Sequence, residues 1–392
     1  MLLRLLDEQG AMTRGELTDR TGLSLPTVAS IVSDLVVRGC VTEVGLRARS
    51  ARRGPRAAAV ALKRTAYQAV GVYLGATDIW VGRCDLSGAV VGARRIPVPS
   101  GASPPDVLRA AITAVGPLVR TAGPALLGIG VAVPAPVDAD RRRTGRTLAT
   151  AWQDVPVADA FTTALHTPAV VEYNVRAMAL AEARHGFGRG VSSLLYLHVG
   201  VGVGIAFLVD GEPVAHGGRG ISELGHRPVV PDGPVCTCGA SGCLEAVLRE
   251  PYLRSLVQKA AGQSPLLDSA AREHRAPLHA LVAAGEQGDP MAGALLAQYL
   301  DHLTTGLATA VDVLSPSCVA LGGMLAQAPK EVLEQLHDAL YPKLSAPLRD
   351  QVSVRPSAIR PHPGVLGGAT VAFEHFFYAG GPPAKAGGSR SR

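Results

Sequence analysis

The chain has 392 residues, 47% of them hydrophobic, which is enough for two or three domains with well-filled cores. No run of about eighteen apolar residues is free of charges or helix breakers, and the first ten residues contain an acidic pair, so we expect neither a membrane span nor a signal peptide. The net charge is +6, and most of that excess is concentrated in residues 1–65, which contain eleven Lys or Arg and six Asp or Glu. Such asymmetry favours an acidic partner for the N-terminal segment over a basic solvated tail.

Three helices are predicted at the N-terminus. Residues 1–9 place leucines on one helical face. Thr13 and Glu16 form a capping box that opens a second helix, which ends before Gly22. Ser24 caps a third helix, which Gly39 ends. The apolar face of this third helix consists of Val28, Ile31, Val32, Leu35 and Val36.

Helix, turn and helix, followed by β-prone runs at 41–44 and 57–62, predict a winged helix-turn-helix. The second helix of such a unit enters the major groove of DNA, where Thr27 and Ser30 would read base edges. The loop between the two runs is rich in arginines that would contact phosphates: Arg47, Arg49, Arg52, Arg53 and Arg56. A small helical interaction domain is the alternative. The arginines favour double-stranded DNA as the partner.

The rest of the chain alternates strands and helices, which predicts an α/β fold. Strands joined by turns are expected over 67–98, and a strand, a glycine loop and a second strand over 194–210. Residues 246–310 are expected to be mostly helical. A strand and Gly-Gly turn are expected over 314–326, and a helix follows near the C-terminus. The Gly-, Pro- and Ser-rich tail over 381–392 is expected to be disordered.

A cluster of metal-binding residue types lies between these elements. Cys236, Cys238 and Cys243 fall within eight residues, and His226 lies ten residues upstream. Four soft or borderline ligands fit a closed tetrahedral zinc site, and because all four positions are taken by protein the Zn²⁺ would be structural. Three ordinary buried thiols are the alternative. The clustering of the cysteines favours a metal site over ordinary thiols. The remaining cysteines are isolated from one another, which suits a reducing cytoplasm. Within the cytoplasm, a DNA-binding protein would be associated with the nucleoid.

The motifs ELGH and CTCGASGCLE within residues 217–245 resemble the signature of the ROK family of repressors, open reading frames and sugar kinases. The resemblance implies a two-lobed body of the actin-like ATPase, sugar-kinase type. It divides the chain into a DNA-binding head (1–65), a smaller lobe (66–180) and a larger lobe (181–380), with the C-terminal helix free to return to the smaller lobe. It also implies that Glu223, His226 and Glu245 contact a sugar; solvated surface charge is the alternative for the two carboxylates.

The sequence departs from the family's kinases at two acidic positions. Tyr73 stands where the phosphate loop of the kinases has an Asp, and the kinase motif Glu-Asn-Asp becomes Glu172, Tyr173 and Asn174. A neutral amide is not a base at neutral pH, so Asn174 cannot deprotonate a sugar hydroxyl, although it can still hydrogen-bond one. We therefore expect no enzymatic activity, no catalytic residues and no dependence on ATP.

Together these features predict a sugar-responsive transcription regulator. Its simplest form is a repressor that a sugar or sugar phosphate releases from its operator. Two half-sites require a homodimer, and the resemblance allows dimers to pair into tetramers. An ATP-dependent sugar kinase with an added DNA-binding head is one alternative. The other is a regulator that has lost sugar sensing and answers to a protein partner, which Tyr173 would favour by filling the pocket.

Overall fold

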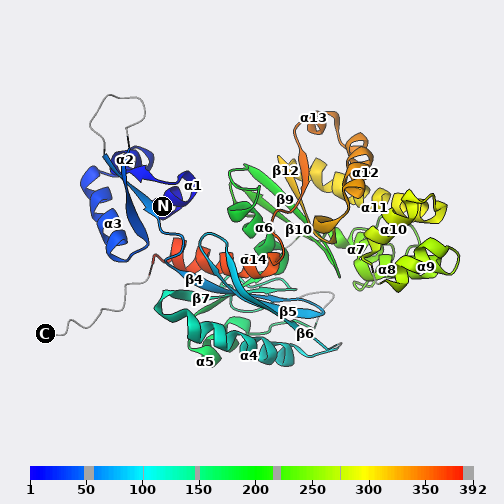
Figure 1. The fold of residues 1–392 in the computed structure, drawn as a ribbon, viewed down its shortest axis with the longest axis horizontal. Coiled ribbons are helices and arrows are strands. Elements are labelled where there is room, and N and C mark those ends of the chain that lie inside the picture. The colour runs from blue at the N-terminus through cyan, green and yellow to red at the C-terminus, as the bar shows by residue number, and fades with distance from the viewer. Residues whose placement is uncertain (48–56, 100, 146–150, 215–221, 274, 383–392) are drawn as a thin grey trace.

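The computed structural model describes residues 1–47, 57–99, 101–145, 151–214, 222–273 and 275–382. The described strands form three sheets, one in an N-terminal head and one in each of two lobes (Figure 1). The arginines Arg49, Arg52, Arg53 and Arg56 and the predicted C-terminal tail lie outside the described residues, except for its first two positions. None of the described helices is both long and apolar enough to cross a bilayer.

The head contains three helices and a small sheet. Helix α1 (Leu2–Gln9) precedes β1 (Met12–Thr13), α2 (Arg14–Thr21) and α3 (Leu25–Val37), and the strands β2 (Val41–Arg47) and β3 (Ala57–Leu62) follow. The predicted capping box is present, because the Thr13 side chain accepts a hydrogen bond from the Glu16 N–H and Glu16 accepts one from the Thr13 N–H. Ser24 caps α3 through the Thr27 N–H, as predicted.

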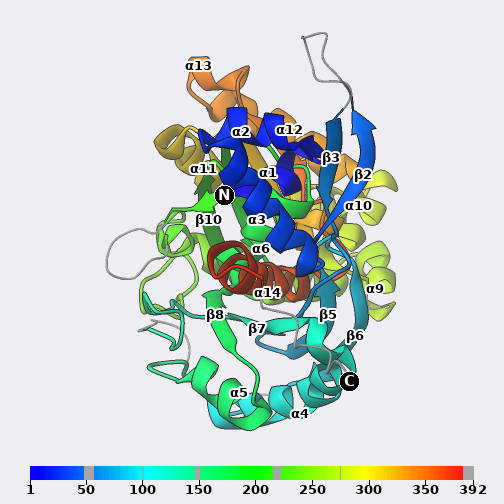
Figure 2. The ribbon, with the colours of Figure 1, turned by 90° about the vertical axis from the view of Figure 1, so that its left-hand side faces the viewer.

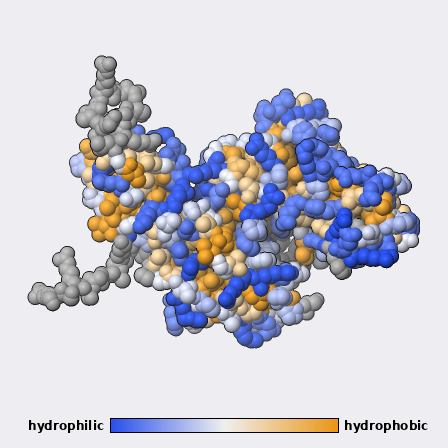
Figure 3. All heavy atoms as spheres, in the orientation of Figure 1, coloured by the Kyte–Doolittle hydropathy of each residue, from blue (hydrophilic) through white to orange (hydrophobic). Residues whose placement is uncertain are grey.

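Two details of the head differ from the sequence prediction. Strand β1, which was not expected, pairs with β3 and widens the sheet to three strands in the order β1-β3-β2. Val36, assigned to the buried face of α3, is 38% exposed, and Leu25 and Val37 of the same helix are exposed as well. The space-filling view shows apolar surface on the head (Figure 3). The 3.6-residue period carries Val36 past the edge of the stripe formed by Val28, Val32 and Leu35.

The smaller lobe is built on a sheet of five strands in the order β6-β5-β4-β7-β8. These are β4 (Gln68–Leu74), β5 (Asp78–Asp85), β6 (Val90–Pro97), β7 (Leu126–Val133) and β8 (Ala169–Tyr173). Strands β4, β7 and β8 are parallel, so their carboxyl ends meet at one edge. Helices α4 (Pro104–Ala122) and α5 (Val157–Leu165) cover one face of the sheet and bury an apolar core against it.

The larger lobe contains the third sheet, in the order β11-β10-β9-β12-β13. Its strands are β9 (Ser193–Val199), β10 (Val203–Val209), β11 (Glu212–Pro213), β12 (Cys318–Gly323) and β13 (Ser353–Pro356). A helical region covers one face: α7 (Leu244–Leu248), α8 (Glu250–Ala261), α9 (Pro265–Arg272), α10 (Pro277–Glu286), α11 (Pro290–Leu314), α12 (Lys330–Leu340) and α13 (Ala346–Arg349). The strand predicted from residue 314 begins only at Cys318, because α11 continues to Leu314.

Two helices lie between the sheets of the lobes. Helix α6 (Asn174–His185) follows β8 directly and packs on β9 and β10, while α14 (Pro363–Phe373) packs on α6 and on strands β4 and β7 of the smaller lobe. The backbones approach closely, since a Cβ on Gly71 of β4 would overlap the Val365 carbonyl oxygen. The head lies beside the end of α14 (Figure 2), and its buried apolar residues are continuous with those of α6 and α14.

Candidate functional site

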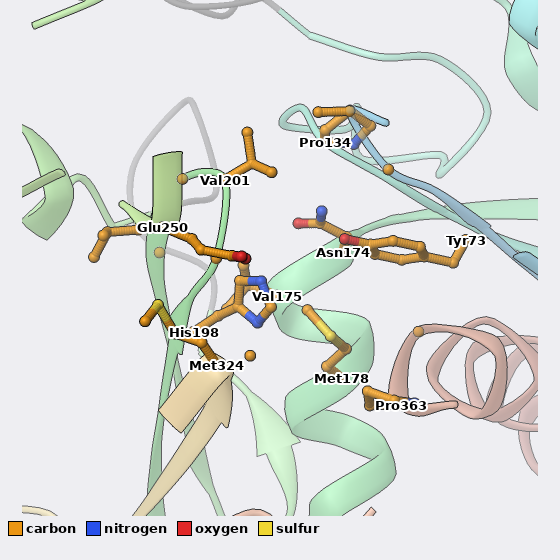
Figure 4. Close-up of a pocket in the computed structure, with 18 of the residues that line it drawn as sticks. Tyr73, Pro134, Asn174, Val175, Met178, His198, Val201, Glu250, Met324 and Pro363 are labelled. Atoms are coloured by element: carbon orange, nitrogen blue, oxygen red, sulfur yellow. The ribbon is translucent and has the colours of Figure 1, made fainter. Parts of the chain in front are cut away.

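A cleft of about 760 Å³ opens between the two lobes (Figure 4). The carboxyl ends of β4, β7 and β8 supply its wall on one side, and those of β9 and β12 supply the wall on the other. Ligands of α/β proteins commonly bind beyond the carboxyl ends of parallel strands, because loops and helix N-termini converge there. The cleft therefore has the size and position of a small-molecule site.

The four residues predicted to bind metal lie together. One ligand atom from each of His226, Cys236, Cys238 and Cys243 falls within a group whose members are all within 4.8 Å of one another. Gly242 adopts a φ of 67°, a left-handed conformation that turns Cys243 back toward the other two thiols. The thiol of Cys243 is fully buried, whereas that of Cys238 is partly exposed.

The spacing of these atoms fits zinc. Tetrahedral zinc would hold thiolates about 3.8 Å apart, and an imidazole nitrogen about 3.5 Å from a thiolate. The Sγ atoms of Cys238 and Cys243 are 3.7 Å apart, and Cys236 Sγ lies 3.5 Å from His226 Nδ1. A zinc ion held by these four residues would tie the loop before α7 to the short helix η3 (Leu224–His226), which carries the histidine.

The residues predicted to contact a sugar all line the cleft: Asn174, Glu223, His226 and Glu245. Because His226 Nδ1 faces the thiols, its Nε2 is directed toward Glu223, whose Oε2 is 3.8 Å away. Glu245 is held at the start of α7, where its carboxylate accepts hydrogen bonds from the Val203 N–H at 3.1 Å and the Thr237 hydroxyl at 3.3 Å. Fixed carboxylates of this kind are suited to accept hydrogen bonds from hydroxyl groups.

Two tyrosines occupy the opposite wall. The Tyr73 hydroxyl is hydrogen-bonded to the side chain of Asn174, the first residue of α6, and burial raises the pKa of Tyr73. The Tyr173 hydroxyl lies against Gly204, where a Cβ would meet it. Burial, and then the negative charges of Glu223 and Glu245, raise the pKa of Tyr173, so both phenols stay neutral at physiological pH.

The acid nearest in sequence to the altered phosphate loop is already paired. Asp78 accepts two hydrogen bonds from Arg95 of β6, at 2.8 and 3.0 Å, and one from the Thr77 hydroxyl. Its carboxylate is thus held by a neighbouring strand of the smaller lobe. It does not take the position that Tyr73 occupies at the end of β4.

Three residues of the cleft were not predicted from the sequence. His198, near the end of β9, has a buried Nδ1 that lacks a hydrogen-bond partner in the described part of the chain, and burial lowers its pKa to about 4. Arg249 also lines the cleft, and its Nε is buried without a described partner. Trp80 lies on the other side of the cleft, beside His362. Unsatisfied buried donors and acceptors favour a ligand or water at the same place.

A feature that points to this part of the cleft was present in the sequence. His198 lies two residues before the glycine loop 200–204, and in α/β proteins such positions face a site when the strand end does. The pattern alone did not separate that possibility from a simple turn between buried strands.

The predicted DNA-contacting residues of the head lie at two places. Thr27 and Ser30 are exposed at the start of α3. Arg47 is the last residue of β2, next to the segment 48–56 that contains the other four arginines.

The architecture defines a two-lobed α/β body of the sugar-kinase type that carries an additional N-terminal head. A model of the ROK family matches residues 69–375, and the chain belongs to that family.

The chain is similar to regulators over nearly its whole length. The xylose repressor of Bacillus subtilis is 24% identical over 382 residues, which cover 96% of this chain and 94% of the repressor. A solved ROK family transcriptional regulator, a homologue of the E. coli MLC protein, shares 20% identity and superposes with a TM-score of 0.79 over 95% of this chain and 94% of that chain.

A kinase resembles the body. The ROK family glucokinase from Streptomyces griseus, solved with glucose and AMPPNP, shares 24% identity and has a TM-score of 0.69. The match covers 99% of the glucokinase and 78% of this chain. The body fold is therefore common to regulators and kinases, so the fold alone does not distinguish the two functions. The distinction has to come from the side chains in the cleft.

Proposed function

We propose that this chain is a DNA-binding transcriptional regulator that senses a carbohydrate in the interlobe cleft and represses transcription until the carbohydrate binds. The observation that carries the proposal is the head. The glucokinase match leaves about a fifth of this chain uncovered, whereas the regulator match extends over 95% of it. A body with an added head is the organisation expected of the family's repressors.

The head is proposed to act as a winged helix-turn-helix, with α3 as the recognition helix. Exposed Thr27 and Ser30 at the N-terminal end of α3 are suited to base edges. Arg47, together with Arg49, Arg52, Arg53 and Arg56 beyond it, supplies positive charge for the phosphates. Two half-sites in an operator require two heads, which supports a homodimer.

The effector is proposed to bind between the lobes, with Asn174 on one side and Glu223, His226 and Glu245 on the other. Zinc on His226 and the three cysteines would be structural, since it fixes the imidazole and the loop that leads to Glu245. Binding across the cleft favours a closed arrangement of the lobes. A preference of about 1–3 kcal/mol for one arrangement is enough to change operator affinity by roughly 5- to 150-fold.

The cleft favours sensing over phosphoryl transfer. The position of the kinase base is the amide Asn174, and it is hydrogen-bonded to Tyr73, which stands at the lost acidic position of the phosphate loop. Neither group accepts a proton at neutral pH. We therefore expect no ADP release in a coupled assay across common hexoses, and sustained turnover would restore the kinase alternative.

Fluorescence anisotropy with DNA from upstream of the gene tests the proposal. Binding should be tight at 50 mM salt and weaken by a factor of at least about ten at 200 mM, because phosphate contacts release counterions. D-Xylose, D-glucose, N-acetyl-D-glucosamine and glucose 6-phosphate are then titrated, and one of them should release the DNA. DNA binding that none of these releases would favour a protein partner, and absence of specific binding at either salt concentration would refute the assignment of the head.

One double variant and one single variant separate the role of the head from that of the cleft. Thr27→Ala with Ser30→Ala should weaken specific binding by about tenfold or more, because base contacts contribute about 1–3 kcal/mol each. Asn174→Ala should keep DNA affinity and lose release by the sugar. The opposite pattern would contradict the assigned roles.

A further inference from the structure

One continuous helical segment runs from the cleft to the head. Helix α14 begins at the cleft, where Pro363 and Gly364 line the wall and Gly364 lies against the ring of Tyr73. It continues into the π-helical turn η6 (Glu374–Ala379), which contacts the head. Residues 364–373 are all buried, so the segment is enclosed between its two ends.

Polar contacts join η6 to α1 of the head, and we call the four residues Arg4, Asp7, Glu374 and Tyr378 the clasp. The guanidinium of Arg4 donates to both carboxylate oxygens of Glu374, at 2.7 Å for the Nη1–Oε1 pair. The Tyr378 hydroxyl donates to Asp7 Oδ2 at 2.9 Å, and the Arg4 guanidinium lies 4.5 Å from the centre of the Tyr378 ring. A bidentate arginine–carboxylate pair fixes orientation as well as distance.

The clasp is also connected to the body. Arg184, in the last turn of α6, donates through Nε to Glu374 Oε1 at 2.8 Å, and it pairs with Glu212 of β11. The side chains of Arg184 and Glu374 are only 10% and 12% exposed, so solvent screens this pair little. Arg189 of the body donates to the carbonyl oxygen of Asp7, which also accepts a hydrogen bond from Arg64 within the head. The head is thus held by oriented, partly buried contacts on several sides.

Between its two ends, α14 packs backbone to backbone against the neighbouring strands and helix. A Cβ on Gly130 of β7 would overlap the carbonyl oxygen of Gly368, and a Cβ on Gly367 would be within 2.7 Å of the Ala177 backbone in α6. Backbone packed on backbone leaves no long side chains that could absorb a shift. A displacement at one end of such a helix is expected to reach the other end, because close-packed interiors transmit strain.

We propose that α14 and η6 transmit closure of the cleft to the head through the clasp. This inference rests on the proposed function, in which closure changes operator affinity. A ligand contact at Asn174 bears on the first turn of α14 through Tyr73, which is hydrogen-bonded to Asn174 and lies against Gly364. The clasp converts movement of the helix into a changed orientation of α1. Because coupling is reciprocal, breaking the clasp must also alter the cleft end of the helix.

The cleft end has a built-in reporter. The Trp80 ring lies 4.9 Å from the ring of His362, the residue that precedes α14. The chain has two tryptophans, so Trp152→Phe leaves Trp80 as the only one. Eleven helical residues separate His362 from Glu374, which corresponds to roughly 16 Å. A response of Trp80 to a change at Glu374 therefore requires transmission along the helix.

The test measures acrylamide quenching of Trp80 in the Trp152→Phe background. Glu374→Gln should change the quenching constant by a factor of about two, and Tyr378→Phe, which removes one hydroxyl and keeps the ring, should change it in the same direction. Glu334→Gln is the matched control, because Glu334 makes an exposed pair with Lys330 on α12 of the larger lobe. Circular dichroism identifies any variant that does not fold. Unchanged quenching in folded Tyr378→Phe, or an equal change in Glu334→Gln, would overturn the proposal.

Operator DNA provides the second readout. With the sugar that releases wild-type protein, release should fall from tenfold or more to less than about threefold in Tyr378→Phe, while calorimetry still detects binding of the sugar. Release equal to that of the wild type would overturn the role of the clasp. If the wild type binds no DNA, the proposed function fails, and the quenching measurement still decides whether the helix couples the cleft to the clasp.

Discussion

His226 connects the two candidate sites of the body at the level of a single ring. Its Nδ1 lies 3.5 Å from Cys236 Sγ, and its Nε2 lies 3.8 Å from Glu223 Oε2, at the wall of the cleft. A metal on one nitrogen fixes the tautomer and the orientation of the other. Loss of the metal should therefore change the orientation of the His226 ring in the cleft, although the proposed ligand does not touch the metal.

Cys238→Ser tests this link. We expect the variant to lose bound zinc, measured by mass spectrometry of the metal, and to lose its response to the sugar, because the loop that leads to Glu245 is no longer anchored. Cys318→Ser is the control, since Cys318 lies in β12 outside the cluster. A Cys238→Ser protein with full sugar affinity and no zinc would refute the link.

His198 makes stability depend on pH. Burial lowers its pKa to about 4 from an ordinary value of 6.5, so below pH 6.5 the unfolded chain binds a proton that the folded chain does not. Stability contributed by the neutral histidine is therefore lost as the pH falls from 6.5 towards 4, by about 1 kcal/mol at pH 5.5.

Calorimetric unfolding at pH 7.5 and 5.5 measures this effect. His198→Gln should show a smaller loss of stability between the two values than the wild type. His337→Gln, at an exposed position of α12, should behave as the wild type. An identical loss in all three proteins would show that His198 does not contribute.

At the scale of elements, the approach of α14 to the smaller lobe depends on glycines in the strands. Gly71 of β4 and Gly130 of β7 face the helix where its carbonyl oxygens come closest, so these positions admit no side chain. Glycine weakens the two strands at these positions, but it allows the backbone of the helix to contact them directly. This contact is what places Tyr73, near the end of β4, beside the first turn of α14.

Gly71→Ala should destabilise the protein by about 3 kcal/mol, because the added methyl group would force the helix away from the sheet. Chemical unfolding measures the change in the free energy of unfolding. Gly262→Ala is the matched control, since Gly262 has open space around its Cβ position and an ordinary helical φ of −64°. Equal stability of the two variants would mean that α14 does not pack as tightly as the structure indicates.

At the scale of the whole molecule, the cleft is the place where the two lobes can respond to a ligand together. The candidate contacts come from both lobes, Asn174 from one side and Glu245 from the other, so a sugar bound as proposed would stabilise the arrangement that satisfies both. The head is attached at the end of α14, so it is positioned to respond to that arrangement.

A sugar that binds the folded protein raises its stability by about 2.7 kcal/mol at a concentration one hundred times its dissociation constant. The effective member of the sugar panel should therefore raise the melting temperature of the wild type by a few degrees. Glu245→Gln should reduce that rise, because it weakens a charged hydrogen-bond acceptor. Absence of a shift with every sugar would favour a regulator that answers to another kind of partner.

Much of this organisation was determined by local sequence. Side chains a few residues apart determine the capping box that opens α2, the Ser24 cap of α3 and the strands of the lobes. Three of the four clustered ligand residues lie within eight positions. The identities of Tyr73 and Asn174 were likewise enough to argue against a catalytic base. Local interactions can be predicted from the sequence because the chain itself fixes the distances between residues that are close in sequence.

Only the tertiary structure decided the rest. It joined Tyr73 to Asn174, turned His198 toward the cleft and brought Glu374 to Arg4, in pairs separated by up to 370 residues. Strand β1 and the exposure of Val36 were decided in the same way, by which surfaces remain after the head packs. Such contacts depend on how sheets and helices are stacked, and hydrophobic periodicity specifies which face is buried without specifying what covers it.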